Sequence, residues 1–106
     1  MHKTHNKSYF DETLEPQIIT VLQNYPILRA AVFGSYSLGT FNETSDVDLI
    51  VDLGSASIGL HYFTLLCDLE DTLQKSVDLL SFDTLDTAPE EVKQNIKNSM
   101  RWFYAV

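Results

Sequence analysis

The apolar residues from Thr13 onward follow the period of an α-helix. Pro16 falls in the first turn, where proline is tolerated, and Pro26 ends the segment. This pattern predicts a helix from Thr13 to the residue before Pro26. Its buried face consists of Leu14, Ile18, Leu22 and Tyr25.

Three short segments show the patterns of β-strands. Residues 27–33 are apolar except for Arg29 and stop at Gly34, which is typical of a buried strand that runs into a tight turn. Residues 46–53 alternate between apolar side chains on one face and mostly acidic side chains on the other. Residues 77–82 form the third predicted strand.

Two further segments follow the helical period. Residues 58–74 carry a broad apolar stripe that predicts a helix packed on the sheet, formed by Phe63, Leu66, Cys67, Leu69 and Leu73. Residues 87–90, Thr-Ala-Pro-Glu, have the pattern of a capping box with proline in the first turn. They predict a closing helix whose inward positions are Val92, Ile96, Met100 and Phe103.

The length of 106 residues leaves room for a single domain over residues 1–106. Residues 1–10 are polar without a period, and we expect a flexible tail there. No segment has the apolar run of a signal sequence or of a membrane span, so we expect a cytoplasmic protein without membrane contact. The single cysteine, Cys67, is interpreted as a small buried hydrophobe.

Seven basic and fifteen acidic residues give a formal net charge of −8. Such a charge repels a phosphate backbone, so we expect no direct contact with nucleic acid. The acidic balance suits a basic protein partner, although solubility explains it equally well.

The segment with chemical potential begins where the first predicted strand ends, at Gly34-Ser35. Backbone N–H groups and a hydroxyl at such a tip can hold phosphate oxygens without a basic side chain. A Gly-Ser pair after a strand is most often only a turn, and the segment is neither a Walker loop nor a dinucleotide fingerprint. Alone, it is a weak indication of a phosphate site.

Asp46 and Asp48 strengthen this indication, because strand alternation puts both carboxylates on one face, close enough to share divalent cations. Asp78, set among apolar neighbours in the third strand, completes a candidate site for Mg²⁺ or Mn²⁺, although taken by itself it is equally consistent with a solvated charge. Metal ions held there would assist phosphoryl or nucleotidyl transfer. Asp52 lies on the same face and is interpreted as a solvated charge at the strand end.

Gly34-Ser35, ten intervening residues and Asp46-Val47-Asp48 resemble the signature of minimal nucleotidyltransferases of the DNA polymerase beta superfamily, in particular the MntA-type antitoxins encoded with HEPN-domain toxins. The resemblance extends from Ile27 to the aromatic residues at 102–104. It implies an α/β (α+β) fold with a small mixed β-sheet flanked by helices. It also implies that the protein transfers AMP from magnesium-bound ATP to a hydroxyl.

Carried over by position, Gly34 and Ser35 would hold the nucleotide phosphates, Asp46 and Asp48 the metal ions, and Asp78 a metal ion and the incoming hydroxyl as general base. In the antitoxin branch that hydroxyl belongs to a tyrosine of the HEPN ribonuclease. The implied protein is a protein adenylyltransferase that silences this toxin and forms a hetero-oligomer with it.

Two alternatives stay open at this point. Leu38 stands where many relatives have a basic residue, and it favours an antitoxin with a weak metal site that neutralises its toxin by direct binding. Transfer to a small molecule is less favoured, because so short a chain has little room for an acceptor pocket.

Overall fold

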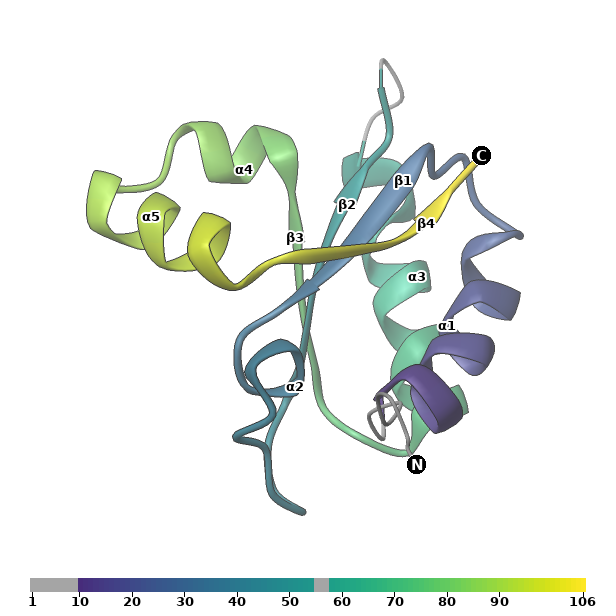
Figure 1. Cartoon of the computed structure of the whole chain (residues 1–106). Coiled ribbons are helices and arrows are strands. Elements are labelled where there is room, and N and C mark those ends of the chain that lie inside the picture. Colours follow the sequence, from purple (N-terminus) through teal and green to yellow (C-terminus); the bar gives the residue numbers. More distant parts are fainter. Residues whose placement is uncertain (1–9, 55–57) are drawn as a thin grey trace.

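A computed structural model of the chain describes residues 10–54 and 58–106, and Figure 1 shows helices and strands alternating along it. In chain order the elements are η1 (a π-helical turn, Phe10–Leu14), α1 (Glu15–Leu22), β1 (Arg29–Phe33), α2 (Ser35–Leu38), β2 (Val47–Asp52), α3 (Ile58–Leu73), β3 (Val77–Ser81), α4 (Phe82–Asp86), α5 (Glu90–Ser99) and β4 (Arg101–Ala105).

The strands form one mixed sheet in the order β3-β2-β1-β4. β1 runs antiparallel to β2 and to β4, whereas β2 and β3 are parallel and are joined by the crossover helix α3. The register pairs Phe33 with Asp48, and Asp48 with Asp78. The end of β1 therefore meets the beginnings of β2 and β3.

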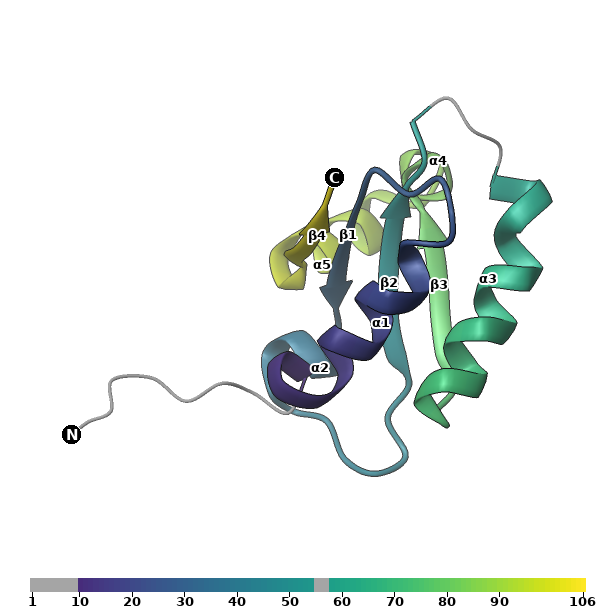
Figure 2. The same cartoon turned by 90° about the vertical axis from the view of Figure 1, so that its right-hand side faces the viewer.

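Helices cover both faces of the sheet: η1, α1 and α3 lie on one side, and α4 and α5 on the other (Figures 1 and 2). Leu49 of β2 packs with Leu69 of α3 in the larger core cluster. The adjacent Ile50 packs with Ile96 of α5 in a smaller cluster. Neighbouring residues of β2 therefore point to opposite faces of the sheet, which confirms the alternation predicted for residues 46–53.

The helices and strands predicted before residue 83 are present, with small shifts at their ends. η1 and α1 together form the helix predicted from Thr13, and β1, β2 and β3 correspond to the three predicted strands. The helix predicted over residues 58–74 is α3. The expected class, a small mixed sheet flanked by helices, is confirmed.

The environments predicted for Phe10, Phe63 and Cys67 are wrong. Phe10, assigned to a tail, is fully buried, and its ring contacts that of Phe103 edge-on at a centroid distance of 5.2 Å; residues 1–9 lie outside the described residues. Phe63 is 72% exposed and Cys67 is only half-buried. The buried face of α3 is centred differently from the predicted stripe, because α3 buries Leu65 beside Leu69.

The C-terminal segment differs most from the prediction. The capping box does not form, because the Thr87 hydroxyl donates to the carbonyl of Thr84 and the helix begins after Pro89. α5 ends at Ser99, and the aromatic residues that follow form β4 at the edge of the sheet, consistent with their preference for strands. Val92, which the sequence predicts to face inward, is 42% exposed.

The single-turn helices α2 and α4 are absent from the predictions, since a periodic pattern needs several turns to become visible. Within the described ranges, no helix has the length and apolar character that a membrane crossing requires.

Candidate active site

Gly34 turns the chain from β1 into α2 with φ +70° and ψ −149°. Residues with a side chain rarely adopt this conformation. Space is restricted as well, because a Cβ atom on Gly34 would lie 2.1 Å from Oδ2 of Asp48. The turn and the Asp48 carboxylate therefore lie against each other, and position 34 favours glycine for two independent reasons.

Asp48 of β2 is in register with Asp78 of the parallel strand β3. Neighbouring strands lie about 4.8 Å apart, and side chains in register point to the same face. Asp46 stands two residues before Asp48, immediately ahead of β2. The backbone thus brings the three predicted acids to one end of the sheet, beside Gly34.

The Asp48 carboxyl is half-buried, and its pKa is raised from the ordinary 3.8 to about 6. Burial is the largest cause, and the negative charges of Asp78 and Asp46 add to it. Within residues 10–54 and 58–106, no basic side chain pairs with any of these three carboxylates. The described residues therefore leave the negative charge at this end of the sheet unpaired, and a bound cation would offset it.

The three carboxylates do not form a closed metal cage. In the part of the chain that the structure describes, no three His, Cys, Asp or Glu side chains converge as a set of metal ligands. Mg²⁺ is usually held by one or two carboxylates, with phosphate oxygens and water completing its shell. Carboxylate oxygens at a site of unbalanced charge fit such an ion, and the assignment of Asp46, Asp48 and Asp78 as ligands stays a prediction.

Helix α5 supplies a second wall of the site that the sequence did not indicate. The Gly34 N–H donates to Oγ of Ser99 at 3.2 Å, and the Ser37 hydroxyl donates to the Ser99 carbonyl. These two hydrogen bonds fasten the end of α5 to the glycine turn. No local motif reveals Ser99, because its partner Gly34 lies 65 positions away in the sequence.

A pocket of about 420 Å³ opens between the turn and α5. Its lining includes Gly34, Leu38, Asn95, Asn98 and Ser99. Leu38 ends α2 and is 63% exposed at this pocket.

Of the two residues predicted to contact phosphate, Gly34 already donates its N–H to Ser99. Ser35 opens α2 and is partly exposed. Its hydroxyl makes no hydrogen bond to any described residue. The roles of Gly34 and Ser35 in nucleotide binding stay predictions.

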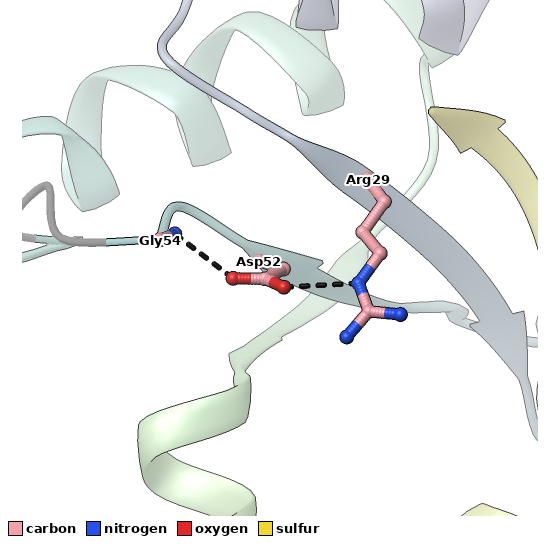
Figure 3. A network of polar contacts seen from close by, with 3 residues as sticks. All are labelled: Arg29, Asp52 and Gly54. Carbon is pink, nitrogen blue, oxygen red and sulfur yellow. Dashed lines mark hydrogen bonds and ion pairs between the residues drawn. The ribbon is translucent and has the colours of Figure 1, made fainter. Parts of the chain in front are cut away.

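Asp52, at the other end of β2, has a different environment (Figure 3). Its carboxylate accepts hydrogen bonds from Arg29 Nε at 2.9 Å and from the Gly54 N–H at 2.8 Å. The Gly54 N–H, followed by Arg29, lowers the pKa of the Asp52 carboxyl. Asp52 is a partly exposed charge at the strand end, as interpreted from the sequence, but it is paired as well as solvated. Its Cα lies about 13 Å along the strand from that of Asp48, outside the site.

Residues 16–105 match the model of the family described as "Polymerase beta, Nucleotidyltransferase". This range contains the glycine turn, the three acids and the end of α5. The chain belongs to this nucleotidyltransferase family. The resemblance seen in the sequence is thereby confirmed.

This nucleotidyltransferase is similar to proteins of Methanocaldococcus jannaschii to which protein adenylyltransferase activity is ascribed. MJ0435 is 35% identical over 72 residues, which are 68% of this chain and 77% of the relative. MJ0126 is 30% identical over 78 residues, which are 74% of this chain and 78% of the relative.

Two solved structures are similar to this chain. A toxin–antitoxin crystal structure with AMP-PNP has a TM-score of 0.70 at 26% identity, and the match covers 87% of this chain and 73% of that one. A tri-AMPylated HEPN toxin in complex with its MNT antitoxin, from Shewanella oneidensis, gives 0.62 at 22% identity, with 87% and 70% covered. The second likeness, at low identity, shows the shared fold alone.

Proposed function

We propose that this nucleotidyltransferase transfers AMP from ATP to a tyrosine hydroxyl of a partner protein, a HEPN-domain toxin, and thereby acts as its antitoxin. The observation that carries the proposal is the Asp48 carboxylate, which lies against Gly34, in register with Asp78, and has a raised pKa. Relatives ascribed protein adenylyltransferase activity and the likeness to a toxin–antitoxin pair with AMP-PNP support the reaction and the partner.

In this proposal Asp46 and Asp48 hold Mg²⁺, which when bound neutralises phosphate charge and assists departure of pyrophosphate. Ser35 and the turn at Gly34 orient the triphosphate along the same end of the sheet. Ser99 keeps the turn in place through its hydrogen bond from the Gly34 N–H. In this proposal the protein positions the reactants and stabilises charge, and it forms no covalent bond to the nucleotide.

Asp78 is the general base of the proposed reaction. It is exposed on β3, at an edge of the sheet, where a hydroxyl from another protein can reach it. The acceptor oxygen bonds to the α-phosphorus of ATP, and its proton passes to the Asp78 carboxylate. The bond from the α-phosphorus to the bridging oxygen breaks, pyrophosphate leaves and AMP stays on the acceptor.

A second candidate is an antitoxin that neutralises its toxin by direct binding. The exposed Leu38 favours it, because this position brings an apolar side chain rather than a positive charge to the pocket beside the turn. This mechanism requires one antitoxin for each toxin, whereas an enzyme protects a molar excess.

One titration separates the two candidates. Toxin ribonuclease activity is measured against increasing antitoxin with ATP and Mg²⁺, and intact mass spectrometry of the toxin follows each point. We expect wild type to protect at substoichiometric amounts and to add whole AMP units, and a variant with Asp46→Asn and Asp48→Asn to do neither. Full protection by the double variant at equal stoichiometry would instead establish direct binding.

A further inference from the structure

The pocket between α2 and α5 has a lining suited to one part of a nucleotide. Phe33, Leu38 and Ile96 provide apolar surface, and Asn95 and Asn98 provide amides from α5. Among the described residues, no charged side chain lines it. A cavity of about 420 Å³ lies within the usual range for small-molecule sites, and an apolar lining with a few polar groups is typical of such sites.

The pocket shares Gly34 with the proposed phosphate site. Gly34 lines the pocket, and it also lies against the Asp48 carboxylate. A molecule with its phosphates beside Asp48 therefore has this pocket as the adjoining space for its uncharged end.

The two asparagines are placed to recognise that end. Their spacing of three residues puts them on one side of α5, both are exposed, and neither side-chain amide bonds to another residue within 10–54 or 58–106. An amide offers a donor beside an acceptor, which matches the N6 and N7 pattern of adenine. Guanine presents two acceptors there and is matched by a basic side chain, which the described lining lacks.

We infer that Asn95 and Asn98 select the adenine base of the nucleotide, with Leu38 packed against the base. This inference rests on the proposed function, since it assigns the base of the same ATP whose phosphates lie at the acids. It also gives Leu38 a role: an apolar side chain suits a base, whereas a basic one would suit a phosphate. The residues determine specificity and take no part in the bond-making step.

Calorimetric titration of the full chain with ATP, GTP and inorganic tripolyphosphate, each with Mg²⁺, tests this inference. The variants are Asn95→Ala and Asn98→Ala. Gln94→Ala is the matched control, because Gln94 is an exposed amide of the same helix that bonds to Glu90 and does not line the pocket. Circular dichroism checks that each variant is folded.

We expect each asparagine variant to lose about 5- to 10-fold in ATP affinity, the usual value of one hydrogen bond. Its preference for ATP over GTP should fall, whereas tripolyphosphate affinity and all affinities of Gln94→Ala should stay unchanged. Unchanged ATP affinity, or an equal loss for tripolyphosphate, overturns the inference and leaves the proposed function standing. A wild type that binds neither ATP nor tripolyphosphate overturns both.

Discussion

Asp48 and Asp52 lie four residues apart on one face of β2, in opposite electrostatic environments. Asp52 accepts hydrogen bonds from Arg29 and from the Gly54 N–H, which lower its pKa. Asp48 is half-buried beside two other carboxylates, and its pKa is raised to about 6. Among the described residues, the charge is paired at the Asp52 end and unpaired at the Asp48 end. An acid whose charge the fold leaves unbalanced marks a candidate functional site.

The glycines beside the two ends of β2 also differ in how they treat the neighbouring carboxylate. Gly54 donates its N–H to the Asp52 carboxylate and so stabilises the charge. Gly34 donates its N–H to Ser99, and its lack of a side chain leaves room for the Asp48 carboxylate. One end of β2 holds a charge that the protein pairs, and the other holds a charge that no basic side chain of the described residues pairs.

Replacing Asp48 should produce the largest effect. We expect Asp48→Asn to lower AMP transfer by more than about 100-fold, because the proposed ligand of the metal ion is lost. Without metal, the variant should be more stable than wild type above pH 6. A raised folded-state pKa means that ionisation of Asp48 destabilises the wild type as pH rises from about 4 to 6. Radiolabelled AMP transfer and urea unfolding measure the two effects, and near wild-type transfer would disprove the metal assignment.

Gly34→Ala should destabilise the protein by about 2 to 3 kcal/mol, from a strained backbone and a collision with Asp48. Gly39→Ala is the control, since Gly39 has φ +79° but a Cβ atom added there would meet no other atom within 4 Å. It should cost only about 1 kcal/mol, the strain alone. Urea unfolding of the two variants gives the difference, and equal losses would mean that the carboxylate does not restrict position 34.

Asp52→Asn should have the smallest effect and the opposite sign to Asp48→Asn. We expect a loss of about 1 kcal/mol at neutral pH and unchanged transfer. A lowered folded-state pKa gives stability that is present above the ordinary Asp pKa near 4 and is lost as pH falls through the folded value. The difference between wild type and variant should therefore shrink on acidification. Unfolding at several pH values checks this, and a difference that grows in acid would contradict it.

The sequence reveals interactions between residues close together in the chain and misses those between residues far apart in it. Strand alternation places Asp46 and Asp48 on one face from local spacing alone. The Asp52–Arg29 pair requires the register between β1 and β2, which the sequence does not show. The tie to Ser99 joins residues still further apart. At the C-terminus, the helical spacing of Ile96 continues past Ser99, although pairing with β1 makes that segment a strand.

We propose that the Asp48 end of β2 is a site for a metal ion and a nucleotide, and that the Asp52 end is not. Unfolding free energy with and without Mg²⁺ and ATP tests it most directly, in wild type, Asp48→Asn and Asp52→Asn. Binding to the folded state stabilises it by about 2.7 kcal/mol when the ligand is at a hundred times its Kd. We expect this gain for wild type and Asp52→Asn, and little or none for Asp48→Asn. An equal gain in Asp48→Asn, or a gain lost only in Asp52→Asn, would contradict it.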